Sequence, residues 1–218
     1  GFSPPFVIED EVFASLIHGY LQFLFSQRSG VATPGIKKMA NADDGVTIHG
    51  KKVIPAGGGW NDAGDERKWM AFIIKNLDAL AHILHSSEEV FRRKACEEIE
   101  WGNQFFHFMI TDEGQIYEDV GGGEIRGGFH YTSGWWNENH PGVTAGGDAT
   151  SDNSPFSGDE RSIRDDYNPA AQYLFVSHQA RLYRQLPPLQ ASRCLILAKR
   201  AWDFGENRGK HERTFILA

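Results

Sequence analysis

The sequence contains few cysteines, no long apolar run and no extended basic segment. Only two of its 218 residues are cysteine, Cys96 and Cys194, and neither lies in a CxxC or Cys/His zinc pattern. No stretch reaches the roughly 18 consecutive apolar residues of a membrane-spanning helix. The net charge is −7 and no long basic run occurs, so nucleic acid is not expected as a partner.

Motifs of several common enzyme classes are also missing. The glycine-rich stretch 121–128 has neither an adjoining strand-to-helix turn nor a following Lys-Ser/Thr pair, so it does not predict phosphate binding. No GxSxG element of serine hydrolases occurs. His82 and His85 lie three apart on a predicted helix, but no third ligand follows at a suitable spacing. We interpret them as surface histidines.

Glycine and aromatic residues are abundant instead. The chain has 24 glycines, and aromatics make up 12% of it. Long, shaped loops that carry flat rings would suit a sugar-binding cleft. The apolar content of 40% and the charged content of 23% are typical of globular proteins.

Apolar residues at spacings of three and four predict five helices. The first runs from Glu9 to near Gly30, and the second follows Asp65 with Trp69 at the start of its buried stripe. The others are expected over 87–109, 169–186 and 189–204. The fold class is therefore all-α. Long antiparallel helices joined by loops of alternating length are typical of a helical-hairpin toroid rather than a four-helix bundle.

Non-helical segments lie between these helices. Short strands are predicted around Val46–His49 and Lys52–Ile54. Residues 111–165 form the longest region without helical periodicity, and long loops of this kind are usually functional. We expect the long loops to form a cleft at one end of the fold.

The stretch GGGWNDAGDERKW (57–69) places Asp62 and Asp65 three residues apart beside Gly64. Three interpretations are open for the two carboxylates. They could cap the following helix, where Asp is a favoured N-cap residue. They could bind a cation, or they could act as a pair on a substrate.

Four segments carry a resemblance to a known family: FSQRSG (25–30), GGGWNDAGDERKW (57–69), EEIEWGNQFFHFMITDEGQIY (97–117) and CLILAKRAWDF (194–204). They resemble glycoside hydrolase family 9, the endoglucanase and cellodextrinase group. The resemblance implies part of an (α/α) six-hairpin toroid, with residues 9–218 as the N-terminal portion of the catalytic domain. Residues 1–8 would be a lead-in or linker from a preceding domain.

The resemblance also implies a mechanism, which is inverting hydrolysis of β-1,4-glucan or a related plant polysaccharide or oligosaccharide. Asp65 would be the general base and Asp62 its assistant. An inverting acid and base stand roughly 6.5–9.5 Å apart, so two neighbouring aspartates suit joint activation of one water instead. The dipole of the following helix would keep Asp65 ionised. The acid glutamate would lie outside this chain, in a second chain or the missing C-terminal half.

Several aromatic and polar residues are candidates for contacts with the sugar. Trp60, Trp135 and Trp136 could stack on glucose-type rings through their π faces. His130 and Tyr131 could bond hydroxyl groups at the rim of the cleft. The alternative for all five is ordinary core or loop packing, and for Trp69 we favour core packing.

No cofactor is required by this mechanism, and no metal ligand is assigned. An oxygen-rich cluster is compatible with calcium, although it lacks EF-hand spacing and a solvated loop is favoured; its members are Asp148, Asp152, Asn153 and Asp159. The resemblance implies a secreted or periplasmic location. Two rival functions stay open, a non-catalytic carbohydrate-binding or scaffold module and a calcium-stabilised interaction domain.

Overall fold

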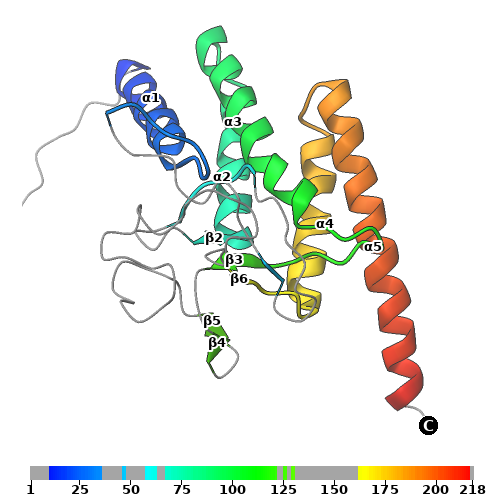
Figure 1. Cartoon of the computed structure of the whole chain (residues 1–218). Coiled ribbons are helices and arrows are strands. Elements are labelled where there is room, and N and C mark those ends of the chain that lie inside the picture. The colour runs from blue at the N-terminus through cyan, green and yellow to red at the C-terminus, as the bar shows by residue number, and fades with distance from the viewer. Residues whose placement is uncertain are drawn as a thin grey trace, which may run out of the picture.

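The computed structural model describes residues 10–35, 46–47, 57–62, 67–121, 125–126, 129–130 and 162–216. Helices dominate this part of the chain (Figure 1). They are α1 (Asp10–Gln27), α2 (Met70–Ile83), α3 (Glu89–Phe108), α4 (Pro169–Tyr183) and α5 (Pro188–Ile216). The predicted all-α class is confirmed. None of the described helices is both long and apolar enough to cross a membrane.

The helix ends differ from the sequence-based boundaries in two instructive places. The second helix begins at Met70 rather than directly after Asp65, because Lys68 and Trp69 pair as a strand with residues 119–120. The third helix begins at Glu89, with Glu88 as its N-cap, rather than at residue 87. The Ser86 hydroxyl still accepts the Glu88 amide at 3.2 Å, so it orders the turn that precedes the helix.

The helices form two packed hairpins and one flanking helix (Figure 1). α2 packs against α3 and α4, α5 packs along α4, and α1 packs against α3. Apolar side chains from these contacts form the core, where Phe105, Phe106 and Phe175 are fully buried. The ring centroids of Phe106 and Phe175 lie 5.1 Å apart. Burial of such aromatic side chains is the main stabilising contribution to a helical layer.

Short strands lie where α2 and α4 begin (Figure 1). One sheet has the order β1-β6-β3-β2, from β1 (Val46–Thr47), β6 (Ser162–Ile163), β3 (Asp119–Gly121) and β2 (Lys68–Trp69). β4 (Ile125–Arg126) pairs with β5 (Phe129–His130). The prediction of a strand at Val46 is confirmed, whereas Lys52–Ile54 lies outside the described residues. The strands β2 to β6 were not predicted.

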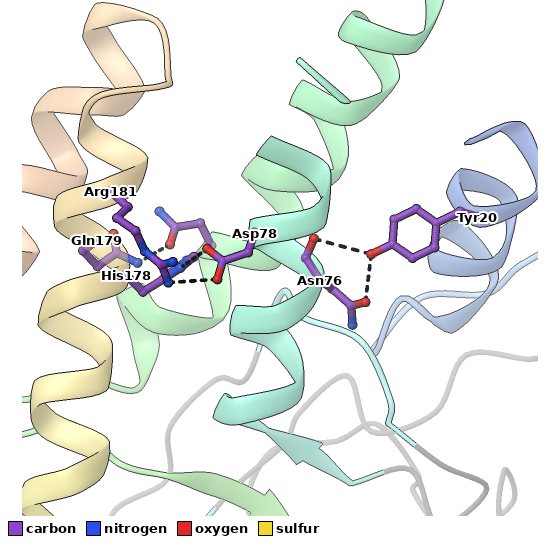
Figure 2. A network of polar contacts seen from close by, with 7 residues as sticks. Tyr20, Asn76, Asp78, His178, Gln179 and Arg181 are labelled. Atoms are coloured by element: carbon purple, nitrogen blue, oxygen red, sulfur yellow. Dashed lines mark hydrogen bonds and ion pairs between the residues drawn. The ribbon is translucent and has the colours of Figure 1, made fainter. Parts of the chain in front are cut away.

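A polar network joins α1, α2 and α4 inside the helical layer (Figure 2). The Tyr20 hydroxyl donates to Asn76 Oδ1 at 2.9 Å. Asp78 accepts from His178 Nδ1 at 3.0 Å and from Arg181 at 2.9 Å. Complete burial lowers the pKa of His178, and the hydrogen bond from His178 lowers the pKa of Asp78. The imidazole is therefore neutral and donates Nδ1–H to a carboxylate.

Gln172 on α4 ties three segments together. Its Oε1 accepts the amide of Ile116 at 3.0 Å. Its Nε2 donates to the carbonyls of Gly114 and Ala201, each at 2.7 Å. The side chain is fully buried, and these three bonds satisfy the oxygen and both amide hydrogens. Gln172 thereby fixes the turn before β3 against α4 and α5.

Candidate functional site

The glycine segment 57–60 runs between α3 and the end of α1. The amide of Gly59 donates to the Trp101 carbonyl at 3.1 Å, and its own carbonyl accepts the Ser29 amide at 3.1 Å. Gly58 and Gly59 have φ values of 80° and 73°, and a Cβ at Gly58 would stand 2.6 Å from the Trp101 oxygen. Only glycine fits this close passage without strain. The segment that leads to Asp62 is therefore held by backbone contacts on both sides.

Trp60 is a core residue in this structure. Its side chain is fully buried, and its Nε1 donates to Glu98 Oε2 at 3.1 Å. The ring packs directly over Gly102 of α3. Sequence reasoning offered sugar stacking or core packing for Trp60, and the described contacts are those of core packing.

Asp62 is half-buried at the neck of the loop that carries the second aspartate. Its amide donates to the Arg67 carbonyl at 2.9 Å, so the four residues 63–66 are joined at their base. Asp65 belongs to these four residues and lies outside the described part of the chain. The predicted convergence of Asp62 and Asp65 on one water therefore stays a prediction.

The helix-capping interpretation of the two aspartates is wrong. Trp69 is the N-cap of α2, with no capping bond from its side chain, and β2 separates the helix from both aspartates. The expected effect of the helix dipole on Asp65 is also not supported. Dipole effects fall off within the first turn of a helix, and α2 begins five positions beyond Asp65.

The side chains of residues 67–69 alternate between the surface and the core. Arg67 forms an ion pair with the fully buried carboxylate of Asp119. The expectation that Trp69 lies in the core is wrong, because 40% of the side chain is exposed. Its Nε1 donates to Glu118 Oε1 at 3.4 Å, and the guanidinium carbon of Arg67 lies 5.1 Å from its ring centroid. Successive side chains of a strand point to opposite faces, so Arg67 and Trp69 point to the same, outer face.

Lys68 points the other way and is completely buried. Its Nζ donates to the Gly58 carbonyl at 3.4 Å and lies 5.5 Å from the centroid of the Phe105 ring. Burial lowers the pKa of this ammonium to about 7. The sequence-based predictions gave Lys68 no role, because a strand of only two residues, Lys68–Trp69, gives no recognisable alternation. The structure places it beneath the glycine segment.

Most of the predicted sugar-contact residues lie outside the described part of the chain. Tyr131, Trp135 and Trp136 are among them, and for His130 only the backbone pairing with Ile125 is described. The oxygen-rich cluster at 148–159 lies outside as well. Within the described residues, no group of three His, Cys, Asp or Glu side chains could hold a metal ion. His82 and His85 are both exposed.

A separate groove of about 860 Å³ lies between α3 and α5. Trp101, His107, Arg193 and Arg200 are among its lining residues, whereas Asp62 and the strand β2 are not. Burial and the charge of Arg193 lower the pKa of His107. This groove is therefore distinct from the candidate site at the beginning of α2.

Comparisons with solved structures give the fold. The chain is similar to a single-mutant thermostable endoglucanase from Alicyclobacillus acidocaldarius, with 19% identity and a TM-score of 0.64 over 92% of this chain and 38% of that chain. It is similar to AaCel9A in complex with cellobiose-like isofagomine, with 18% identity and a TM-score of 0.66 over 92% of this chain and 38% of that one. An endoglucanase from the termite Nasutitermes takasagoensis gives 16% identity and a TM-score of 0.57 over 92% and 44%.

These similarities cover most of this chain but only about two fifths of each related structure. The described helices are thus part of an (α/α) toroid, as predicted. A comparison with curated protein sequences gives no match. The family model of glycosyl hydrolase family 9 matches residues 13–216. The chain belongs to glycosyl hydrolase family 9.

Proposed function

We propose that this chain is the N-terminal portion, over residues 9–218, of a glycosidase that hydrolyses β-1,4-glucan or a related plant polysaccharide or oligosaccharide. The observation that carries the proposal is family membership together with the backbone-clamped segment that presents Asp62. Similar structures include endoglucanases and a complex with cellobiose-like isofagomine. Residues 1–8 would be a lead-in from a preceding domain.

The proposed mechanism is inverting hydrolysis. Asp65 removes a proton from a water molecule, and Asp62 orients that water. Asp62 lies at the closed base of the four residues 63–66, which include Asp65, and this closure supports the proposal that both carboxylates act on one water molecule. A glutamate outside this chain protonates the leaving oxygen from the opposite side of the sugar ring, at the roughly 6.5–9.5 Å separation of inverting carboxylates.

The proposed substrate contacts are His130, Tyr131, Trp135 and Trp136. The aromatic rings would cover C–H faces of glucose units, and His130 and Tyr131 would bond hydroxyl groups. Trp60 supports the site from the core through its bond to Glu98. A second chain or a C-terminal half completes the site. No cofactor is required, and the location is secreted or periplasmic.

Reducing-sugar release from carboxymethylcellulose tests the proposal. The full-length protein is compared with Asp65→Ala and Asp62→Ala, and with Asp112→Asn as a control on an exposed turn. We expect loss of at least about 100-fold in rate for Asp65→Ala, since a general base contributes about 10²–10⁴-fold. The Asp112 variant is expected to retain wild-type activity. Equal release by wild type and Asp65→Ala would end the catalytic assignment.

Two further measurements separate the rival functions. NMR of the first products from cellotetraose should show the α-anomer if the reaction inverts the β-linkage; initial β-anomer would contradict inversion. A non-catalytic binding module would bind cellotetraose without releasing reducing sugar. A calcium-stabilised domain would melt at a lower temperature after chelation with EDTA.

A further inference from the structure

The side chain of Trp69, at the end of β2, is far more exposed than those of the residues on either side of it. Lys68 and Met70 are buried at 0% and 1% exposure, whereas Trp69 is 40% exposed. Strand alternation turns the Trp69 side chain away from the core, so part of its ring is accessible to a ligand.

The ring of Trp69 is held on one face and at one edge. The Arg67 guanidinium lies over the ring at 5.1 Å, and Arg67 is itself anchored by the buried Asp119. The indole Nε1 donates to Glu118 at 3.4 Å, and the other carboxylate oxygen of Glu118 accepts from Asn168 Nδ2 at 2.9 Å. These contacts fix the ring while part of it stays exposed.

The same contacts join the beginnings of two helices. Trp69 is the N-cap of α2 and Asn168 is the N-cap of α4. Glu118 bonds to both side chains, so it links the ends of α2 and α4 that border the strand layer. An exposed ring that is held by Arg67 and Glu118 is preorganised, which lowers the entropy lost when a ligand binds.

Trp69 also lies close to the candidate catalytic loop. Its backbone follows Arg67 by two residues, and Arg67 closes the neck of that loop with Asp62. Chain connectivity alone keeps the Cα atoms of Trp69 and Asp65 within about 14 Å, at up to 3.6 Å per residue. A bound oligosaccharide can span that distance.

We propose that the exposed part of the Trp69 ring binds a glucose-type ring of a β-1,4-linked oligosaccharide. The C–H groups of such a ring pack on the π face of the indole. Glu118, which accepts the indole N–H at the edge of the ring, is placed to bond a hydroxyl group. This proposal rests on the proposed function, and it adds a substrate-binding residue that the family resemblance did not supply.

Calorimetric titration with cellotetraose tests the proposal in the full-length protein with Asp65→Ala, so that the ligand stays intact. Adding Trp69→Leu removes the ring, and adding Trp69→Phe keeps a smaller one. Trp202→Leu is the matched control, since Trp202 is 48% exposed on α5 and packs against Tyr173. We expect about 5- to 30-fold weaker binding for Trp69→Leu, from about 1–2 kcal/mol of lost stacking. Trp69→Phe should lose less, and Trp202→Leu should bind as the parent does.

A second measurement needs no stable Trp69→Leu protein. The protein is labelled with 5-fluorotryptophan, and the fluorine resonance missing from Trp69→Phe belongs to Trp69. That resonance is expected to shift on addition of cellotetraose, and the Trp202 resonance is expected to stay in place. Unchanged affinity in Trp69→Leu, an unshifted Trp69 resonance or no cellotetraose binding at all would overturn the proposal.

The two proposals fail in different ways. If the ring binds cellotetraose but Asp65→Ala releases as much reducing sugar as wild type, the catalytic assignment is wrong and Trp69 remains a binding residue. If hydrolysis requires Asp65 but the Trp69 variants bind normally, the proposed function stands and the role given to Trp69 is wrong.

Discussion

Trp60 and Glu98 meet across 38 positions of the sequence, where the indole Nε1 donates to Oε2 of a buried carboxylate at 3.1 Å. Arg28 joins them with a 2.9 Å ion pair to Oε1 of Glu98. The Arg28 guanidinium also lies 4.9 Å from the Trp101 ring centroid. One carboxylate thus connects the end of α1, the glycine segment and α3, which are three of the segments that carry the family resemblance.

Replacement of Glu98 by Ala should destabilise the protein strongly. Glu98 has 5% side-chain exposure and Arg28 has 19%, so its loss leaves a buried indole N–H and a partly buried cation without their carboxylate. We expect a decrease of about 3 kcal/mol or more in the free energy of unfolding, measured by urea denaturation. The control is Glu97→Ala. Glu97 is 61% exposed, and its ion pair with Arg93 is long, at 3.9 Å. Loss of this weak surface pair should change the free energy of unfolding by less than about 1 kcal/mol.

Gly102 is the position where α3 touches the Trp60 ring. A Cβ there would lie 2.2 Å from the ring atom Cη2, which is far inside van der Waals contact. Gly102→Ala should therefore destabilise the protein by about 1–3 kcal/mol through overpacking, despite the better helix propensity of Ala. Gly19→Ala is the matched control in α1, since nothing lies within 4 Å of its Cβ position. It should leave stability unchanged or raise it by up to about 1 kcal/mol. Similar losses in both variants would contradict the role of the Trp60 contact.

The helices could be predicted from sequence because their apolar residues recur with the helical period over many turns. The short strands could not. β2 and β6 have two residues each, and such strands exist only through pairing with a partner that is distant in sequence. This is also why α2 was predicted to begin too early. The pairing of Lys68 with Val120 outweighs a helical pattern that extends back through Trp69.

The candidate site was predicted only in part for a related reason. The spacing of Asp62 and Asp65 and the adjoining glycines were visible in the sequence, and Gly58 and Gly59 do take the positive φ values that require glycine. Burial of particular rings was not visible. Helical spacing placed Trp69 in the core, but strand spacing governs that residue and directs Lys68 inward. The role of Trp60 depends on Gly102 and Glu98, which only the tertiary fold brings together.

Asn168 caps α4 and also bonds to Glu118, which accepts the indole N–H of Trp69. Its Oδ1 accepts the amides of Ala170 and Ala171 at 3.0 and 3.3 Å, and its Nδ2 donates to Glu118. Asn168→Ala should lower the free energy of unfolding by about 1 kcal/mol through loss of the N-cap. Asn168→Ser keeps a capping oxygen and should stay within about 0.5 kcal/mol of wild type. The urea midpoints of the two variants would measure both losses, provided that the dependence of the free energy on urea concentration is unchanged. Equal losses in the Ala and Ser variants would show that the N-cap bond does not stabilise the protein.

His178 should make stability depend on pH below neutrality. Its burial lowers the pKa in the folded state, while the unfolded chain binds a proton with a pKa of about 6.5. The unfolded state therefore binds more protons between these two values. Stability from the neutral imidazole is present above about pH 6.5 and decreases as the pH falls below it, by up to about 1.4 kcal/mol per pH unit. The lowered pKa of Asp78 acts only in more acidic solution, below its unfolded value of about 3.9.

Urea denaturation at pH 7.5, 6.5 and 5.5 would measure this dependence in wild type and in His178→Gln. The variant loses the titrating ring, so its free energy of unfolding should decrease less steeply between pH 6.5 and 5.5, even if its stability at pH 7.5 is lower. Because Asp78 also accepts from Arg181 at 2.9 Å, the carboxylate keeps one partner in the variant. His85→Gln removes an exposed imidazole and serves as the control. Its free energy of unfolding should depend on pH as that of the wild type does. An unchanged slope in His178→Gln would mean that the buried ring is not the group that titrates, and the neutral state assigned to it would be wrong.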